Sequence, residues 1–487
     1  MRFALPGHLI RGGRGHGRNG RLGVVWRQTA AKKGAEFLGA LLLERTACLR
    51  RLGRDRAGTV AFGRFLNNEA VSLETILATA VRHTAEAARG RHVLALQDTT
   101  ELNFWRHAGS KKGFGVVGNG RDIGLFLHPV IVIEAGDGDP RQVGHAGGVL
   151  GLADANFYTR AKAPPGGRKS REKQRRIPRA IETKETGRWV EGLVQADRRL
   201  REAAMVSVIA DRESDFYELF AKPRSAHVHL IVRAAHNRHM SDGARLMAAM
   251  AAAPHVAGQD IFIPAKDGRA ARRARTRVSW REIELPRPRV GFELDRLPAS
   301  VKLNAVMVEE IDAPEGVKPI VWVLLTTHAV ESLEDALRIV GWYRARWTIE
   351  QVFRAMKSQG FDIEDSQIET LEPMKKLALA VLIAALRVMQ LVNARSGATG
   401  QKLADAMDEA AEPLVEALTA KLEGKTLRQK NPHAKGTLAR LSWVVGRLGG
   451  WDGYEGRGYK PPGPITMIRG LARFDALREG WEMRQIV

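Results

Sequence analysis

The stretch from Tyr343 to Lys357, YRARWTIEQVFRAMK, brings together residue types that could perform phosphate chemistry. Its Tyr343, Arg346, Glu350 and Lys357 lie three, seven and fourteen positions along from the first. An α-helix turns about 100° per residue, so all four would fall within roughly 60° of arc, and Arg354 joins them. The pattern predicts one helix that presents a carboxylate among cations and a phenol and buries another face. A carboxylate can bind a metal ion, and the cations and the phenol can bind phosphate.

Two further carboxylates come at the ends of short apolar runs. HVLALQD ends on Asp98, and MVSVIAD ends on Asp211, so each Asp is expected at the end of a buried strand. Three carboxylates that met at one edge of a sheet would repel one another unless a cation were present. Oxygen ligands of this kind suit Mg²⁺, and two such ions about 3.5–4 Å apart can activate water and stabilise a leaving oxygen. Asp98, Asp211 and Glu350 therefore predict phosphodiester cleavage or strand transfer.

Each of these residues also has a structural interpretation. An Asp at a strand end is most often a cap or a turn residue, and a Glu on a helix is usually solvated. A helix face that alternates cations with a carboxylate can be a surface laced with ion pairs. Residue type and spacing leave both interpretations open.

The charge of the chain favours a polyanionic partner. Its 487 residues carry 77 Lys and Arg against 54 Asp and Glu, a formal charge of +23. An excess of this size is typical of proteins that bind nucleic acid, although an Arg-rich composition also follows from a GC-rich genome. The hydrophobic content of 44% indicates a globular chain.

Cysteine and hydropathy exclude several classes of protein. A single cysteine, Cys48, leaves no disulfide framework and no cysteine-based zinc site, and it fits a reducing cytoplasm. The most apolar run, Leu377 to Leu386, is too short to span a bilayer. We therefore expect a buried core helix there, no signal peptide and no membrane partner.

Periodicity divides the chain into helical and β-rich parts. Apolar residues at helical spacing dominate both ends, and short strand patterns dominate the middle, with a β-rich stretch too long to be a loop. The basic stretches 162–179 and 266–277 are candidate contacts to a DNA backbone or simply solvated loops. The expected regions are a basic, disordered Gly/Arg-rich leader (1–35), a helical DNA-binding domain (36–90), an α/β core (91–235 and 334–370), an inserted β subdomain (236–333) and a helical C-terminal region (371–487).

Three blocks resemble one known family. LALQDTTEL around Asp98, VIADRESDFYELF around Asp211 and YRARWTIEQVFRAMK around Glu350 are similar to the motifs of DDE-type insertion-sequence transposases. The resemblance is specifically to the bacterial cut-and-paste group with the Y-R-E-K signature, the IS-four group, from about residue 60 onward. The resemblance implies a ribonuclease-H-like core, a bacterial cytoplasmic protein associated with the nucleoid, and an enzyme that cleaves transposon ends and joins their 3′-hydroxyls to target DNA.

The resemblance also assigns roles at the candidate site. Asp98, Asp211 and Glu350 match the metal-binding acidic triad, which implies two Mg²⁺ ions, with Mn²⁺ as a substitute. It implies as partners double-stranded DNA, both inverted-repeat ends and target, and a homodimer whose contacts lie in the C-terminal helices. The expected DNA contacts are Tyr343, Arg346, Lys357, Arg354, Arg233, Arg64 and Trp322, the last as a platform for a flipped base during hairpin formation.

The N-terminal region departs from the family pattern. The stretch FLGALLLERTACLRRL lacks the acidic-then-basic motif that family members carry there, although RFLNN, which starts at Arg64, resembles the segment before the catalytic domain. Two alternatives follow: a catalytically silent DNA-binding inhibitor or decayed copy, and a host nuclease on the same fold. His128 matches a family histidine, and the sequence gives no role for it.

Overall fold

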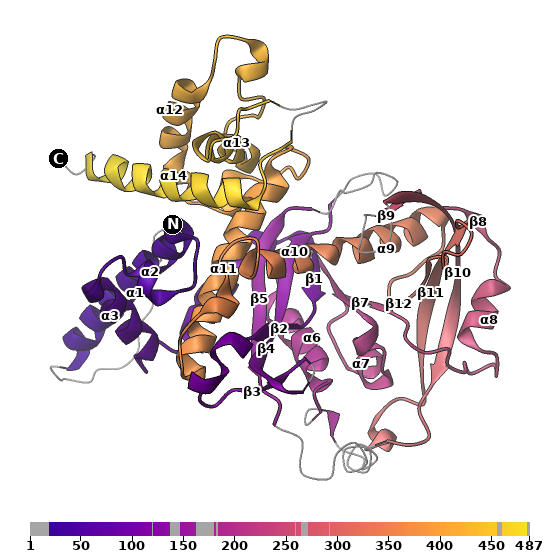
Figure 1. Ribbon diagram of the computed structural model, residues 1–487. Coiled ribbons are helices and arrows are strands. Elements are labelled where there is room, and N and C mark those ends of the chain that lie inside the picture. Colours follow the sequence, from indigo (N-terminus) through magenta and orange to yellow (C-terminus); the bar gives the residue numbers. More distant parts are fainter. Residues whose placement is uncertain are drawn as a thin grey trace.

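A mixed β-sheet forms the centre of the molecule and is covered by helices on both faces in the computed structural model (Figure 1). The structure describes residues 19–118, 120–136, 147–161, 180–181, 184–258, 260–263, 271–291, 293–454 and 460–484. In the described residues the sheet runs β2-β4-β1-β6-β7-β12-β11-β10-β8, with β3 and β5 also pairing with β4. The core strands are β1 (His92–Gln97), β2 (Thr100–Asn103), β3 (Gly115–Val117), β4 (Asp122–Glu134), β5 (Val149–Tyr158), β6 (Met205–Ala210) and β7 (Val228–Arg233).

Three neighbouring strands of the core are parallel. Strand β1 pairs in parallel with β6, and β6 pairs in parallel with β7, whereas β4 is antiparallel to β1 on its other side. Because the carboxyl ends of parallel strands meet at one edge, the residues that follow β1, β6 and β7 lie close together.

The expected β insertion extends this same sheet. Strand β12 pairs antiparallel with β7, Leu324 opposite Arg233, and β11 and β10 follow it outward (Figure 1). Arg272, Arg275 and Arg277, from the basic stretch 266–277, form ion pairs on this ribbon with Glu310, Asp312 and Glu309. The stretch 162–179 lies outside the described residues. The elements of the insertion are α8 (Leu246–Ala251), β8 (Val256–Ala257), β9 (Ile261–Ile263), β10 (Arg272–Pro286), η4 (Leu294–Arg296), β11 (Ser300–Ile311) and β12 (Val321–Thr326).

Alternate residues of the central strands point into two separate cores. Leu94 and Leu96 of β1 face one core, and Val93 and Ala95 face the other, as the two-residue period of a strand requires. The first core lies under α9 (Leu333–Ala345), α10 (Trp347–Met356) and α11 (Leu371–Ala394), and the second under α6 (Gly187–Arg199), α7 (Tyr217–Ala221) and α8. Side chains that leave the sheet on opposite faces therefore meet different helices.

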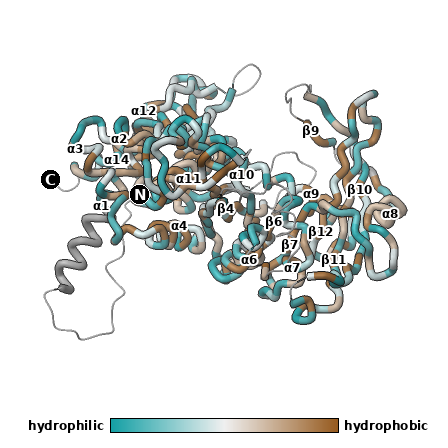
Figure 2. The backbone as a smooth tube through the Cα atoms, turned by 60° about the horizontal axis from the view of Figure 1, so that its bottom comes forward, coloured by the Kyte–Doolittle hydropathy of each residue, from teal (hydrophilic) through white to brown (hydrophobic). Residues whose placement is uncertain are grey.

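Helices from both ends of the chain pack around α11. Its 18-residue window of highest hydropathy would be apolar enough to cross a bilayer, but 89% of that window is buried inside the protein, so α11 is a core helix, and Figure 2 shows it as a brown segment inside the molecule. Helix α1 begins at Asn19, so only residues 1–18 of the expected leader lie outside the described residues. The terminal helices are α1 (Asn19–Glu44), α2 (Leu49–Leu52), α3 (Arg56–Asn67), α4 (Leu73–Ala88), α12 (Glu412–Leu422), α13 (Leu438–Leu448) and α14 (Pro464–Arg484).

Candidate active site

Asp98 and Asp211 lie side by side at the carboxyl ends of β1 and β6. Each aspartate is two residues beyond the paired residues Leu96 and Ile209 of these parallel strands. Each carboxylate also accepts a local backbone hydrogen bond, Asp98 from the N–H of Thr99 at 2.8 Å and Asp211 from the N–H of Glu213 at 2.9 Å. These turns begin where the strands end, and they place both carboxylates at one edge of the sheet.

The predicted helix from Tyr343 to Lys357 is divided at Arg346. Helix α9 ends at Ala345 and α10 begins at Trp347. The N–H of Arg346 donates to the carbonyl of Tyr343, and the N–H of Ile349 donates to the carbonyl of Arg346. These bonds span three residues, the tighter spacing of a 3₁₀ turn. The prediction of one continuous helix was therefore wrong at Arg346, because the chain overwinds there.

Arg346 connects two of the three carboxylates. Its Nη1 lies 2.5 Å from Oδ2 of Asp98, and its Nη2 lies 3.1 Å from Oε1 of Glu350. The three side chains are 16%, 19% and 29% exposed, so water screens these ion pairs less than it would on an open surface. The guanidinium group thus occupies the space between carboxylates that come from a strand end and from α10.

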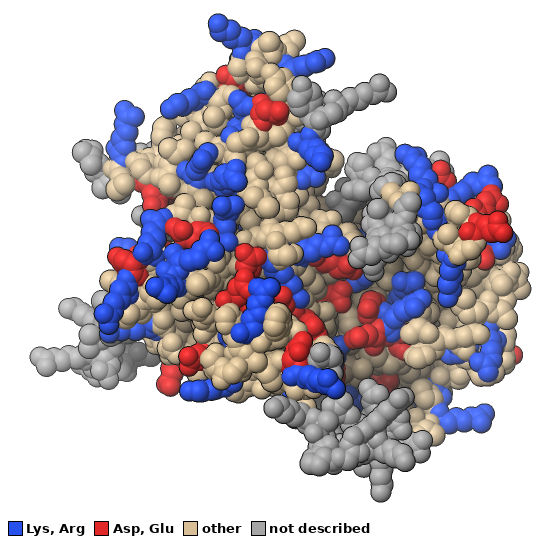
Figure 3. Space-filling model, viewed as in Figure 1, with Lys and Arg blue, Asp and Glu red and all other residues tan. Residues whose placement is uncertain are grey.

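The carboxylates share one electrostatic environment. Burial raises the pKa of Asp98 to about 6; Arg346 and the N–H of Thr99 oppose this shift, and the charges of Asp211 and Glu350 add to it. Asp211 and Glu350 therefore both lie near enough to Asp98 for their charges to act on it. Figure 3 shows acidic side chains gathered along the hollow beside the inserted lobe, with Lys and Arg on both sides of it.

A second group of predicted residues lies next to Arg346. The guanidinium of Arg233, at the end of β7, is 5.8 Å from the ring centroid of Trp322 on β12, and this ring is 5.9 Å from that of Tyr343. Arg346 is 6.0 Å from the Tyr343 ring. Nε of Arg233 is buried without a hydrogen-bond partner among the described residues. Such an atom suits an anion that would approach from outside.

The remaining predicted contacts lie elsewhere. Lys357, at the end of α10, forms an ion pair with Glu364 at 3.2 Å. Arg354 is exposed on α10, with its guanidinium 5.2 Å from the Trp347 ring. Arg64 is exposed on α3, among the N-terminal helices that pack against α11. The structure therefore groups Asp98, Asp211, Glu350, Arg346, Tyr343, Arg233 and Trp322, and it places Lys357, Arg354 and Arg64 outside this group.

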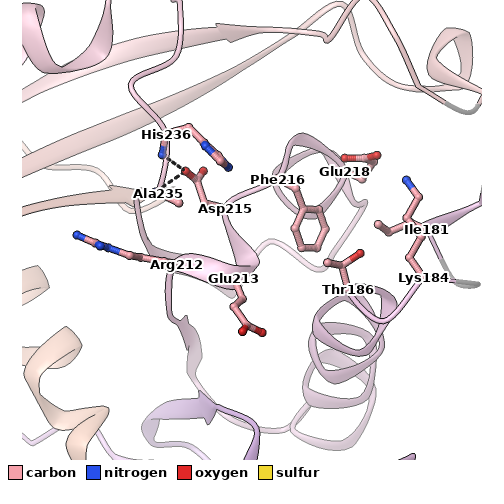
Figure 4. Close-up of a pocket in the computed structure, with 10 residues that line it drawn as sticks. All are labelled: Ile181, Lys184, Thr186, Arg212, Glu213, Asp215, Phe216, Glu218, Ala235 and His236. Carbon is pink, nitrogen blue, oxygen red and sulfur yellow. Dashed lines mark hydrogen bonds between the residues drawn. The ribbon is translucent and has the colours of Figure 1, made fainter. Parts of the chain in front are cut away.

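The sequence interpretation missed a cavity beside Asp211. A hollow of about 400 Å³ opens between the start of α6, η3 (Arg212–Ser214) and α7. Figure 4 shows the Phe216 ring among side chains from these elements, and Asp215 held by the backbone N–H groups of Ala235 and His236. The polar run from Asp211 to Phe216, which follows β6, was the sequence feature that could have indicated this cavity. Most of the other residues that line it come from other parts of the chain.

Residues 190–387 match the family model described as the transposase DDE domain. The match supports a DDE transposase. The matched range contains Asp211 and Glu350 and begins after Asp98. DDE transposases typically use divalent metal ions, which accords with the gathering of carboxylates found here.

One solved structure with some similarity is a piggyBac transposase synaptic complex with hairpin DNA. Its TM-score is 0.35 at 11% sequence identity, over 82% of this chain and 74% of that chain.

The donor set fits a hard divalent cation, although the side chains are not arranged around one. Asp98, Asp211 and Glu350 supply only oxygen donors, which Mg²⁺ and Mn²⁺ prefer. Within the described ranges, no group of three or more His, Cys, Asp or Glu side chains is close enough to hold an ion. The position of Arg346 between Asp98 and Glu350 explains this spacing.

Proposed function

We propose that this protein is a metal-dependent transposase of the IS-four, Y-R-E-K group that cleaves transposon ends and joins their 3′-hydroxyls to target DNA. The observation that carries the proposal is the meeting of Asp98, Asp211 and Glu350, from β1, β6 and α10, around Arg346. Chain segments far apart in sequence have no structural need to bring three acids together, since like charges at close range cost free energy.

In this proposal the acidic triad holds divalent metal ions. Bound there, such ions would supply a nucleophilic hydroxide and stabilise the leaving 3′-oxygen. Arg346 would give up its contact with Asp98 and Glu350 and bind a phosphate oxygen instead. Its planar guanidinium pairs equally well with a carboxylate and with a phosphate, so the exchange costs it no hydrogen bonds.

Arg233, Tyr343 and Trp322 would hold the DNA strand at the site. The unpartnered Nε of Arg233 supports a phosphate contact. The burial of Tyr343, only 6% exposed, supports a donor held at a fixed position rather than a mobile one. Trp322 is partly buried between these two residues, and in the proposal its ring stacks on a flipped base when the end closes into a hairpin.

The partners in this proposal are two transposon ends, target DNA and a second copy of the chain. The formal charge of +23 supports a DNA partner. The C-terminal helices α12 to α14 are the candidates for contacts between the two copies, and the exposed apolar residues Ile465, Leu477 and Met483, all on α14, support this role.

An end-cleavage assay tests the proposal. The purified protein is incubated with a duplex that carries the inverted repeats flanking its reading frame, with Mg²⁺, Mn²⁺ or EDTA, and nicks, hairpins and joined strands are resolved on denaturing gels. Metal-dependent nicking at the repeat end is expected, and Glu350→Gln should abolish it. The matched control is Glu334→Gln, an exposed acid at the start of α9, which should nick normally. Equal nicking by both variants would contradict the role of Glu350.

A second candidate function is DNA binding without catalysis. The observation that favours it is that Arg346 already pairs with both Asp98 and Glu350, the carboxylates that a metal ion would need. Under this alternative the wild-type protein shifts the repeat duplex in a gel but binds no Mn²⁺ and produces no nick. Titration of the protein with Mn²⁺, followed by the loss of the free-ion signal in electron paramagnetic resonance, separates the two functions.

A further inference from the structure

Arg188 lies at the first turn of α6, on the face of the sheet opposite Arg346, and its side chain is 7% exposed. Nε donates to the hydroxyl of Thr99 at 2.9 Å, and Nη1 donates to the carbonyl of Glu185. Nη2 donates to the carboxylate of Glu213. One buried guanidinium therefore contacts the turn after Asp98 and the turn after Asp211 at the same time.

The hydrogen bonds on the Asp98 side have a fixed direction. Oε1 of Gln97 can only accept, so Nε2 of a neutral His128 ring donates to it at 3.1 Å. Nδ1 of His128 is then left to accept from the hydroxyl of Thr99, 2.9 Å away. Burial lowers the pKa of His128 to about 3, so the ring is neutral and has the single N–H that this chain of bonds requires. Both neighbours of Asp98 in the sequence are thus fixed.

On the Asp211 side, a single residue, Glu213, connects Arg188 to the carboxylate. Glu213, which accepts from Arg188, donates its own backbone N–H to Oδ1 of Asp211 at 2.9 Å. Only one residue therefore separates the guanidinium from each catalytic carboxylate: Thr99 on one side and Glu213 on the other.

Close packing keeps α6 against this network. A Cβ at Gly192, one turn along α6, would lie 2.3 Å from Oε1 of Gln97, so only glycine lets the helix approach the sheet here. The ring of Trp189 meets that of His128 edge to face at 4.7 Å. Arg188 is therefore held between a tightly docked helix and the strand ends.

We propose that Arg188 is a positioning residue that fixes the distance between Asp98 and Asp211 for metal binding, acting through Thr99 and Glu213. The inference rests on the proposed function, because the distance between Asp98 and Asp211 matters only if both carboxylates bind the same metal centre. Groups that orient metal ligands typically affect metal affinity by about 10–100-fold. The role needs the planar fork of arginine, since the single ammonium of lysine cannot reach three acceptors in these directions.

The test measures Mn²⁺ binding to the full chain by electron paramagnetic resonance for Arg188→Lys and Arg188→Gln. Both variants are expected to bind Mn²⁺ about 10–100-fold more weakly than wild type, with an unchanged dissociation constant for the repeat duplex. Thr99→Val removes the hydroxyl that Arg188 contacts and should show the same loss, whereas Thr99→Ser retains the hydroxyl and should bind Mn²⁺ normally.

Arg199→Gln is the matched control for a merely structural effect. Arg199 is also a partly buried arginine on α6, paired with Asp154 and the carbonyl of Ala153 at the other end of the helix. It should lower the melting temperature and leave Mn²⁺ affinity unchanged. Equal losses for Arg199→Gln and Arg188→Gln, or wild-type affinity in both Arg188 variants, would overturn the positioning role.

Hydrogen exchange provides a readout that needs no metal. Backbone amides of residues 98–101 and 211–215 should exchange faster in Arg188→Gln than in Arg199→Gln. Unchanged exchange there would also overturn the proposal. If wild type binds no Mn²⁺ and makes no nick, the proposed function and this inference fail together; if wild type does both and only the variant results fail, this inference alone is rejected.

Discussion

The two ends of the parallel strands β1, β6 and β7 carry two polar clusters of opposite character on the same face of the sheet. At the carboxyl end, Asp98, Asp211 and Arg233 lie near Arg346 and Glu350. We call this the carboxyl-end cluster. At the amino end, His92, Ser207 and His229 meet His328, and we call this the amino-end cluster.

The members of the amino-end cluster contact one another closely. The hydroxyl oxygen of Ser207 lies 2.8 Å from Nε2 of His92 and 2.7 Å from Nε2 of His328, so it can donate to one ring and accept from the other. His229 stacks on His328 with ring centroids 4.2 Å apart, and Trp342 of α9 covers His92 and His328. Burial lowers the pKa of His328 to about 3.

Both clusters are partly or fully buried, but they differ in how far their polar groups are paired. The hydroxyl of Ser207 bonds to two of the imidazoles, and the carbonyl of Thr327 lies 3.3 Å from Nδ1 of His229, so within the described residues these groups have partners inside the protein. The carboxyl-end cluster keeps charges of both signs at reduced exposure, together with a buried guanidinium nitrogen that has no described partner. A group of polar residues thus indicates a reactive site when its own members leave charge or hydrogen-bonding capacity unused.

The largest expected difference between the clusters is in catalysis. Asp211→Asn and Ser207→Ala change opposite ends of one strand, β6. Asp211→Asn should slow end cleavage on the order of a thousandfold or more, because metal ions contribute several kcal/mol to such reactions. Ser207→Ala should cleave at nearly the wild-type rate in single-turnover assays at saturating metal. A comparable loss in both variants would remove the distinction between the clusters.

The reverse difference is expected in stability. His328→Ala deletes a ring that is 7% exposed and leaves Ser207 short of a partner, which should lower the free energy of unfolding by about 2–4 kcal/mol. Glu350→Gln, in the more exposed cluster, should change it by less than about 1 kcal/mol. Urea unfolding followed by circular dichroism measures both. The distinction fails if Glu350→Gln is the more damaging change.

The clusters should also respond to pH with opposite slopes. The pKa of His328 is about 3, below the ordinary 6.5, so its stabilising contribution is complete above pH 6.5 and is lost as the pH falls toward 3. The slope for one proton is at most about 1.4 kcal/mol per pH unit. The pKa of Asp98 is about 6, above its ordinary 3.8, so its contribution is complete below pH 3.8 and is lost as the pH rises through 6.

Urea unfolding of two variants at a series of pH values separates these slopes. His328→Gln should make the stability fall less steeply toward acid than it does in wild type. Asp98→Asn should instead remove a loss of stability toward neutral pH. Parallel curves for the wild type and His328→Gln would show that this ring does not titrate on unfolding as described.

The smallest expected effect is that of Lys357, which lies just outside the carboxyl-end cluster. Lys357 already has Glu364 as a partner, and Lys357→Gln should alter stability by less than about 1 kcal/mol. If Lys357 contacts a phosphate as the Y-R-E-K resemblance implies, the variant should lower the salt dependence of repeat binding by about one unit of slope. An unchanged slope in filter-binding titrations would place Lys357 outside the DNA interface.

Local sequence was enough to locate the strand ends at Asp98 and Asp211, but not the side chains that bind to the residues at these ends. Asp98 and Asp211 follow β1 and β6 as expected, because short apolar runs before an acid mark buried strands. The division of the Tyr343–Lys357 helix was not predictable from angular positions, which assume uniform winding. The bonds of Arg346 to Asp98 and of Arg188 to Thr99 depend on how distant elements pack, and periodicity carries no information about that.

The amino-end cluster shows the same limit more sharply. His92, Ser207 and His229 come from three strands, and His328 follows β12, near the end of the insertion. Only the strand order places them together. His92 and His328 lie 115 and 121 positions from Ser207 along the chain, so nothing in the sequence alone connects them.

The pairing of β7 with β12 means that the insertion helps to position residues of the candidate site. Leu324 pairs with Arg233, and Trp322, two residues earlier on the same face, thereby lies beside that arginine. A shift of one residue in this pairing would turn Trp322 to the α6 side of the sheet. The hairpin of β10 and β11 can therefore change in length at its far tip during evolution without consequence for the indole, whereas an odd-numbered insertion or deletion between residue 322 and residue 324 would remove it from the site.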